Sequence, residues 1–526
     1  MPTRDPLIQI PAGCPLHPSS GLSRRNFLRG CAACAGAAAF SGGTRLLGSP
    51  GSDGPKIRII YALHGPVQEV PDWPNKGFDF RPVMDQMNTE LGKRFPDYSF
   101  LPTLATGEEQ AKKILSDDAS AGIDGYLVVQ MNCWNRVAQT IATSGKPVLY
   151  ADFAYAGSGG FLVYAAGFLR AGTRNLGFVA SSRTRDLAEA VKCFAAAKKA
   201  GPGFDFASAV AASRRAATPQ PGNLACASDA LSVLPTGETV KRMKASKILA
   251  VRGAAADPAT TAMGIPVVFL PFAELNAAWA AADKAEAEAV ADRWIKSAEL
   301  VDGVARTEII NSAAMYLGQK AVLKKHGANA IMINCLGGFY GGHIHAYPCL
   351  GFHELLNEGL VGACECDVPS TATMVAITAM TKGRPGYISD PVIDTAKRRI
   401  IYAHCVASNR AFGPSGAANP YQILTHSEDR QGASVRSLLP AGYMTTTLEI
   451  SDARKEIIFH QARAMGNDPN DRACRTKLEA EPVGDIEKLF TMWDVWGWHR
   501  VTFYGDLKKP VYDLAGALGW KVVEEA

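Results

Sequence analysis

The sequence has no run of about 18 or more consecutive apolar residues, which argues against a membrane-spanning helix. It also has little net charge, since 55 basic and 50 acidic residues leave +5. The excess lies within the first 50 positions, where five arginines face a single acid, Asp5. The remaining chain is nearly neutral and offers no basic surface for nucleic acid. We therefore expect neither a membrane span nor a nucleic-acid partner.

Two other kinds of motif are missing. Three of the 12 cysteines, Cys14, Cys31 and Cys34, precede residue 50, and the rest are odd in number with no C-x-x-C pair. This argues against a dense disulfide framework. The sequence also lacks G-x-G-x-x-G and the P-loop pattern, so we expect no nucleotide cofactor.

The first 50 residues have the pattern of a targeting segment. Ser23 to Leu28 reads SRRNFL, a weakly apolar stretch follows at 31–40, and small residues occupy 41–51. This resembles a twin-arginine signal, and the alternative is a chance Arg-Arg before an alanine-rich helix. We predict that 1–50 is a signal segment recognised by the twin-arginine export machinery, and that the protein is exported to the periplasm or beyond the cell.

The rest of the chain is long enough for several domains. The whole sequence has 526 residues and is 47% hydrophobic. A single hydrophobic core stops growing at roughly 250–300 residues, so the chain is expected to form more than one. Short apolar runs alternate with helical stretches, which is typical of doubly wound parallel sheets. We predict two such α/β domains, at 55–168 and 169–345. Their clearest strands are expected at 56–63, 125–129, 147–150, 247–251, 266–270 and 330–334.

After about residue 370 the pattern changes. Short strands separated by turn signals are expected at 398–403, 421–425 and 444–450. We therefore predict that 346–526 forms a mixed, mainly antiparallel β domain. The predicted fold class is α/β, with two doubly wound parallel-sheet domains followed by this C-terminal domain.

Two acids stand at alternate positions in the segment 362–368. If this segment is extended, Glu365 and Asp367 share one face, and Cys364 and Cys366 share the other. Two carboxylates on one face can bind a divalent cation or act as acid and base. The alternative is an edge strand with a solvated acidic face.

Two histidines repeat this geometry in His343-Ile344-His345, which follows a glycine-rich loop after a predicted strand. Imidazole is a common ligand for transition metals. The pair alone is weak evidence for a metal site.

The chain from about residue 330 resembles the L-fucose isomerase-like sugar isomerases, whose relatives include L-arabinose isomerase. The matching stretches are 363–368 (ACECDV), 404–405, 425–426, 439–442 (LPAG), 497–499 (GWH) and 504–506 (YGD). The resemblance implies a divalent metal, typically manganese, held by two carboxylates and a histidine, which stabilises charge on the sugar oxygens during proton transfer through an ene-diol. It maps one carboxylate to Asp367 and the histidine to His499.

The chain departs from this resemblance at the other carboxylate. The resemblance implies an acid about two dozen residues before Asp367, but no acid occurs from 331 to 351. Either His343 or His345 replaces it as a ligand, which would favour zinc or iron over manganese, or the site is degraded. In this interpretation Glu365 is the candidate base.

Three other residues are candidates for substrate binding. His64 ends the first predicted strand, at the edge where such sheets bind ligands. Trp498 has an aromatic face suited to a sugar ring, and Arg436 can meet a hydroxyl. The structural alternatives are that Trp498 packs in the core and that Arg436 forms an exposed salt bridge.

Three functions stay open at this point. The first is a metal-dependent aldose–ketose isomerase acting on a free sugar. The second is another carbohydrate enzyme, a lyase or glycoside hydrolase, on the same scaffold. The third is a non-catalytic periplasmic sugar-binding protein. The resemblance also implies a homo-oligomer.

Overall fold

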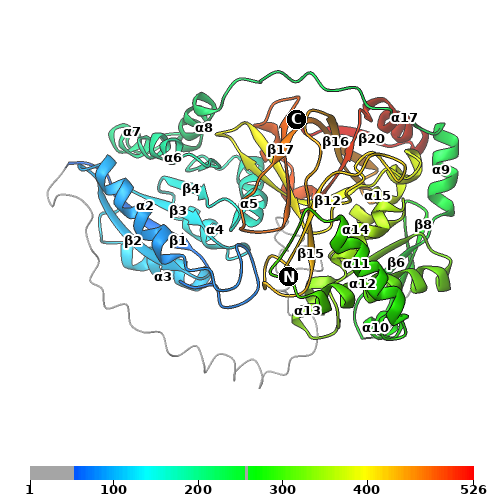
Figure 1. Cartoon of the computed structure of the whole chain (residues 1–526). Helices are drawn as coiled ribbons and strands as arrows, with labels where there is room; N and C mark the ends of the chain where they lie inside the picture. The colour runs from blue at the N-terminus through cyan, green and yellow to red at the C-terminus, as the bar shows by residue number, and fades with distance from the viewer. Residues whose placement is uncertain (1–52, 255–258) are drawn as a thin grey trace, which may run out of the picture.

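The computed structural model describes residues 53–254 and 259–526. The predicted export segment at 1–50 lies outside these residues. The described framework consists of two parallel sheets and an antiparallel β-barrel, and Figure 1 shows the barrel strands between the two sheets. In this part of the chain, no helix is both long and apolar enough to cross a membrane.

The first sheet has five parallel strands in the order β2-β1-β3-β4-β5. Its side chains alternate between two cores: Ile57, Ile59 and Tyr61 enter one, and Ile60 and Ala62 enter the other. Helices pack against both cores, as the pattern predicts. The strands are β1 (Lys56–Ala62), β2 (Ser99–Ala105), β3 (Gly125–Gln130), β4 (Val148–Asp152) and β5 (Leu176–Val179). The helices are α2 (Arg81–Arg94), α3 (Glu108–Asp118), α4 (Val137–Ala142), α5 (Ser158–Arg170), α6 (Thr184–Val191), α7 (Cys193–Ala200) and α8 (Phe206–Ala217).

The second sheet has the order β11-β10-β6-β8-β7 and is parallel except for the β7–β8 pair. Its central strands are short and fully buried, which is typical of parallel strands covered on both faces. The strands are β6 (Ile248–Val251), β7 (Thr260–Ala262), β8 (Ile265–Leu270), β10 (Ala330–Ile333) and β11 (Val361–Ala363). The helices are α9 (Thr236–Ala245), α10 (Phe272–Ala280), α11 (Lys284–Ser297), α12 (Arg306–His326), α13 (Cys335–Tyr340), α14 (Cys349–Asn357) and α15 (Val368–Met380).

The C-terminal region contains a closed barrel of six antiparallel strands, in the order β16-β19-β12-β13-β18-β17, with β17 pairing back to β16. The predicted fold class, with a mixed, mainly antiparallel β domain, is therefore wrong for this region. The barrel strands are β12 (Tyr387–Asp394), β13 (Arg399–His404), β16 (Met444–Ser451), β17 (Glu456–Asn467), β18 (Thr476–Pro482) and β19 (Arg500–Tyr504). Around them lie β20 (Lys521–Glu524), which is parallel to β17, α16 (Trp493–Trp496), α17 (Lys508–Leu518), a short 3-10 helix at Lys488–Phe490, and a small sheet of β9 (Leu300–Asp302), β14 (Tyr421–Leu424) and β15 (Ser434–Ser437).

The barrel closes because one long strand has a different partner at each end. β17 pairs with β16 through Glu456 to Arg463, and with β18 through Ala462 to Asn467. The register with β18 shifts between Ala464 and Gly466. Such a bulge bends a strand and increases its twist, which closure of a sheet requires. Short apolar runs in a sequence carry no sign of this long-range register.

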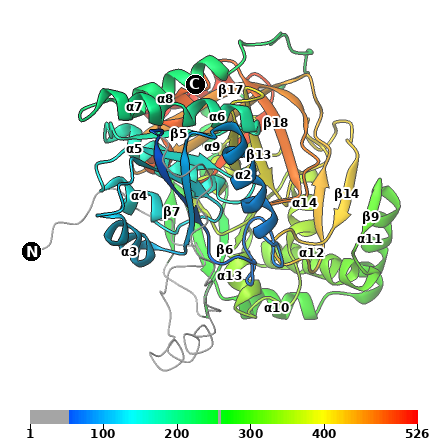
Figure 2. The ribbon, with the colours of Figure 1, turned by 90° about the vertical axis from the view of Figure 1, so that its left-hand side faces the viewer.

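An irregular segment at 218–235 links the two parallel-sheet regions. It runs along the barrel from α8 to α9 (Figure 1), and Figure 2 shows the first sheet and its helices in front of the barrel strands β13 and β18. Ala227 forms a bridge with Tyr443, and Asp229 pairs with the buried Arg384. The composition of 202–236, rich in alanine, serine, proline and glycine, predicts an irregular insertion, but its first part forms α8 and only 218–235 is irregular. The contacts of 218–235 fasten it to the barrel.

Candidate functional site

The candidate site begins where β11 ends. This strand stops at Ala363, and the chain then turns through Glu365 and Cys366, whose φ angles are 62° and 56°. The left-handed region is unfavourable for residues other than glycine, and strained residues of this kind cluster at functional sites. The extended segment expected at 362–368 is therefore replaced by a turn. Glu365 lies within this turn, whereas Asp367 lies at its end, immediately before α15.

Asp367 is the N-cap of α15, a helix that lies beside the barrel strand β16. Its Oδ1 accepts a hydrogen bond from the backbone N–H of Ser370 at 3.0 Å, and Pro369 occupies the first turn. Both features favour the start of a helix. The cap leaves Oδ2 of Asp367 to face His499.

Three further side chains come from one end of the barrel. Asp390 on β12 pairs with Ala403, so it lies beside His404, the last residue of β13. His499 immediately precedes β19, whose first residue, Arg500, pairs with β12. Antiparallel pairing of β12 with both neighbours thus brings Asp390, His404 and His499 together against Glu365.

Glu365, Asp390, His404 and His499 form a compact cluster, in which one ligand atom from each lies within 4.8 Å of the others. His499 Nε2 is 3.0 Å from Asp390 Oδ1 and 3.4 Å from Glu365 Oε2. His404 Nε2 is 3.5 Å from Glu365 Oε1 and 3.9 Å from Asp390 Oδ2. Two carboxylates and two imidazoles therefore face one point.

Four atoms of this cluster are buried and form no hydrogen bond of acceptable geometry: His404 Nδ1, and the three ligand atoms that face the common point, His404 Nε2, His499 Nε2 and Asp390 Oδ1. Buried polar atoms in native structures are nearly always paired, with protein, water or an ion. Oxygen and imidazole nitrogen are the ligands of divalent transition metals. The donor set and its unpaired atoms fit a divalent metal, so the cluster can hold one.

The buried carboxylates and imidazoles of the cluster shift one another's pKa values. Burial raises the pKa of Glu365, but the facing His404 and His499 outweigh it and hold this pKa well below its usual value. Burial raises the pKa of Asp390. For both histidines, burial lowers the pKa, and the facing carboxylates reverse this, so the imidazole pKa values are raised. A metal cation can take the place of the protons that such a site attracts.

Asp367 lies one contact behind the cluster. Its Oδ2 is 2.8 Å from His499 Nδ1, the ring nitrogen that faces away from Glu365 and Asp390. A carboxylate that accepts a hydrogen bond from Nδ1–H orients the ring and directs Nε2 toward the metal position, as is usual for histidines that bind metals. We predicted Asp367 as a metal ligand and catalytic residue. The structure brings it to the site but places it behind His499.

The structure places His343 and His345 outside the cluster, on the loop after α13. His343 stacks on Phe272 of α10 at 5.8 Å between ring centroids, and His345 meets Trp279 edge-on at 5.7 Å. The cluster already has two carboxylates, Glu365 and Asp390. The reason for expecting a histidine substitution is therefore removed.

Sequence reasoning missed Asp390 and gave His404 no metal role. A signal was present for Asp390, since it is an acid in the middle of the strand Tyr387–Asp394, whose residues are all buried, and is followed by Pro391. A charged residue in such a strand needs a partner, because burying an unpaired charge is unfavourable. No local pattern indicates that His404 and His499 supply it.

Trp498 joins the barrel to the first α/β unit. Its ring centroid is 6.3 Å from that of Trp73 and 6.0 Å from that of Trp134. Its ring also fills the space above Gly159 at the start of α5, where a Cβ would lie 1.5 Å from it. Trp498 therefore forms an aromatic cluster beside His499.

The other two predicted substrate contacts are engaged with protein groups. His64 Nδ1 is 3.3 Å from Asp72, and its Nε2 is 3.1 Å from the carbonyl oxygen of Cys133. Arg436 on β15 donates from Nε to the carbonyl oxygen of Arg475 at 3.0 Å. Neither belongs to the four-residue cluster.

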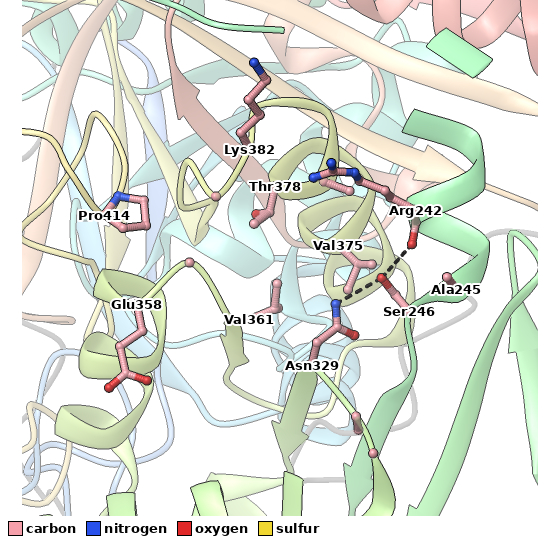
Figure 3. Close-up of a pocket in the computed structure, with 15 residues that line it drawn as sticks. Arg242, Ala245, Ser246, Asn329, Glu358, Val361, Val375, Thr378, Lys382 and Pro414 are labelled. Carbon is pink, nitrogen blue, oxygen red and sulfur yellow. Dashed lines mark hydrogen bonds between the residues drawn. The ribbon is translucent and has the colours of Figure 1, made fainter. Parts of the chain in front are cut away.

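A cavity of about 560 Å³ lies elsewhere, at the opposite end of the second sheet's strands. Figure 3 shows Asn329, Ser246 and Arg242 joined there by hydrogen bonds. Glu358, the carboxylate among its described lining residues, is 3.0 Å from Lys320. Ligands bind at the carboxyl ends of strands in such sheets, whereas this cavity lies at the amino ends. Its described lining also contains no histidine or cysteine beside this one carboxylate, so it lacks the donor set of the cluster.

The comparisons with known proteins give partial similarity to sugar isomerases. No family model matches the chain. The sulfoquinovose isomerase of Alkalicoccus urumqiensis is 22% identical over 161 residues, which are 29% of this chain and 36% of that protein. The sulfoquinovose isomerases of Priestia aryabhattai and Priestia megaterium are each 28% identical over 131 residues, which are 23% of this chain and 28% of those proteins. The matches thus span about a third or less of these curated relatives.

Two solved structures, described as "XylFII molecule" and "XylFII-LytSN complex", align with 55% of this chain and 85% of their own. They are 11% and 12% identical, with TM-scores of 0.14, which carry no argument about this fold. The partial similarity to the curated relatives supports, at most, a relationship to sugar isomerases. Membership of the fucose isomerase-like family stays a prediction.

Proposed function

We propose that this protein is a metal-dependent sugar isomerase that interconverts an aldose and a ketose. The observation that supports this most directly is the cluster itself, in which three buried and unpaired ligand atoms face one point beside Glu365. The similarity to sulfoquinovose isomerases independently supports carbohydrate isomerisation.

Four side chains would hold the metal: Glu365, Asp390, His404 and His499. When bound, a divalent cation supplies a Lewis acid that stabilises negative charge on a carbonyl oxygen and its neighbouring hydroxyl oxygen. The fucose isomerase-like resemblance favours manganese. Two imidazoles among the ligands are equally suited to zinc or iron, so elemental analysis must decide.

The proton transfer needs a base that a sugar can reach. The Glu365 side chain is 24% exposed, whereas those of Asp390, His404 and His499 are nearly inaccessible. In the proposed step, Glu365 accepts the proton as the C2–H bond breaks and returns it as the new C1–H bond forms. The hydroxyl proton passes from O2 to O1, so the aldose and ketose have the same composition.

Trp498 is the proposed sugar-facing residue beside this base, since it directly precedes His499 and has an aromatic ring. Apolar ring faces pack on the C–H faces of sugars while hydroxyls bind polar groups. Export by the twin-arginine machinery and assembly into a homo-oligomer stay predictions.

The experiment has two stages. The purified protein is first analysed for metal without any addition, and we expect near-stoichiometric manganese, zinc or iron. The metal-loaded protein is then incubated in D2O with pentoses, 6-deoxyhexoses and a sulfonated aldohexose. Solvent deuterium should appear at C2 of one substrate, by NMR, and a chelator should abolish the exchange.

The matched variants are Glu365→Gln, at the proposed base, and Glu299→Gln, at an exposed position. Loss of a general base lowers rates by about 10²–10⁴-fold, and we expect that loss only for Glu365→Gln. A metal-loaded protein that binds a sugar but neither interconverts aldose and ketose nor exchanges the C2 proton would instead be a binding protein. Cleavage of a glycoside would indicate a hydrolase or lyase.

A further inference from the structure

A buried carboxylate far from β19 in sequence holds the first residue of that strand. Glu525 follows β20, and neither its side chain nor that of Arg500 is exposed. Arg500 donates from Nη2 to Glu525 Oε1 at 2.7 Å and from Nε to Oε2 at 3.3 Å. This two-pronged contact fixes the plane of the guanidinium.

The other edge of the same guanidinium holds the segment that carries the site. Arg500 Nη1 donates to the carbonyl oxygen of Gly497 at 3.1 Å and to that of His499 at 2.8 Å. Those carbonyls lie on either side of Trp498. One side chain therefore clamps the backbone that presents both Trp498 and His499.

A hydrogen-bonded chain inside the barrel holds Glu525 in turn. His460 Nδ1 is 3.0 Å from Glu525 Oε2, and His460 Nε2 is 2.7 Å from the hydroxyl of Tyr402. Thr447 donates to the same hydroxyl at 3.0 Å. The polar groups of this hydrogen-bonded series are paired with one another, so the Glu525 carboxylate has little freedom to move.

We infer that Glu525 is a positioning residue, which acts through Arg500 to hold His499 and Trp498 in place at the cluster. This inference rests on the proposed function, because it assigns Glu525 a role in presenting a metal ligand. Glu525 touches neither the cluster nor a substrate position, and it is therefore not a catalytic residue.

The physical reason lies in the charge of Arg500. A guanidinium cannot lose its proton in a protein, so without Glu525 it would be a buried and unpaired cation. It would then turn toward water or another acceptor and release the carbonyls of Gly497 and His499. The Nε2 atom of His499 would no longer be held toward Asp390 and Glu365.

The test compares Glu525→Gln with two controls in the full chain. Glu524→Gln changes the adjacent exposed residue. Glu354→Gln removes the charge of another buried carboxylate, which pairs with the half-exposed Arg293 and lies remote in the second sheet's helices. Co²⁺ is titrated into each metal-free protein, and its visible spectrum reports the coordination. Contacts behind a ligand typically change metal affinity 10–100-fold, and we expect such a loss and a changed spectrum only for Glu525→Gln.

A second measurement does not depend on the metal. Hydrogen exchange followed by mass spectrometry reports the backbone of 497–500 in metal-free protein. Faster exchange in this segment is expected for Glu525→Gln, with the two controls unchanged there. If Glu525→Gln fails to fold, Arg500→Lys keeps the positive charge, loses the fork of contacts and should give the same two results.

The outcomes separate the two proposals. Wild-type protein that binds no Co²⁺ at the cluster would overturn the proposed function, and hydrogen exchange would still test the clamp. Wild-type affinity and spectrum in Glu525→Gln, or unchanged exchange at 497–500, would overturn the positioning role. An equal loss of affinity in Glu354→Gln would also overturn it, because the effect would then follow stability alone.

Discussion

At the scale of single residues, the site depends on how each charged group is paired. Glu365 and Asp390 face two imidazoles. Asp367 contacts one imidazole, that of His499, and only at Nδ1, the nitrogen that faces away from the cluster. Glu449 has a different situation, since its Oε2 accepts a hydrogen bond from Ser370 and its Oε1 is buried without a partner. These different pairings lead to two predictions.

The first prediction concerns Asp367. If it orients His499 rather than binding the metal, Asp367→Asn should weaken metal affinity by roughly 10–100-fold while stoichiometry stays at one. Asp390→Asn, which removes a ligand, should abolish stoichiometric binding. Isothermal titration with Mn²⁺ and Zn²⁺ measures both. Equal loss in the two variants would make Asp367 a ligand.

The second prediction concerns Glu449 and pH. Burial raises the pKa of Glu449 well above its usual value, and the charge of Asp367 raises it further. The folded chain therefore keeps a proton that the unfolded chain releases above pH 4.5. The stability that this proton contributes is complete below pH 4.5 and falls as the pH rises.

Glutamine mimics the protonated acid, so Glu449→Gln should match the wild type near pH 4.5 and exceed its unfolding free energy at pH 8. The difference should grow by up to about 1.4 kcal/mol per pH unit. Urea denaturation of metal-free protein at pH 5, 6.5 and 8 measures it. A variant less stable than the wild type at pH 8 would contradict this account.

At the scale of secondary-structure elements, α5 is shaped to receive Trp498 from the barrel. Gly159, in its first turn, leaves room for the indole, and a Cβ there would overlap the ring. In α17, by contrast, a Cβ at Gly516 would meet no atom within 4 Å. The same substitution should therefore have opposite effects in the two helices.

Gly159→Ala should lower the unfolding free energy by about 1–3 kcal/mol, as overpacking does, because the Trp498 ring must move. Gly516→Ala should raise it by about 0.4–1 kcal/mol, since alanine restricts the unfolded chain and fits a helix. Chemical denaturation followed by tryptophan fluorescence measures both. Stabilisation by Gly159→Ala would show that Trp498 is not packed there.

At the scale of the whole molecule, the cluster links two units of the fold. Glu365 follows a strand of the second sheet, whereas Asp390, His404 and His499 belong to the barrel end. A metal held by all four would join the two units. It would bind the native state alone, because the unfolded chain does not bring these residues together.

Removing metal with a chelator should therefore lower the melting temperature, and adding it back should restore it. The expected gain is about 2.7 kcal/mol at a free metal concentration of 100 times Kd. Calorimetry at increasing metal concentration measures the shift. The double variant Asp390→Asn/His404→Gln should show no such shift, and a shift equal to that of the wild type would place the stabilising metal elsewhere.

Elements whose patterns are local could be predicted from the amino-acid sequence. The apolar residues that dominate 56–63 and 330–334 predicted buried strands, because strands covered on both faces are rich in apolar residues, and β1 and β10 lie there. The sequence also predicted Glu365, Asp367 and His499 as residues of the functional site. The tertiary structure alone decided how these residues divide their roles, since a turn with positive φ separates Glu365 from Asp367.

The closure of the barrel and the membership of Asp390 and His404 in the site depend on long-range pairing, which no local pattern records. Closure follows from the two pairings of β17, and the site follows from the register of β12 with β13 and β19. Both join residues far apart in the chain. Local patterns record which residues are buried, but register between distant strands depends on the packing of the whole molecule.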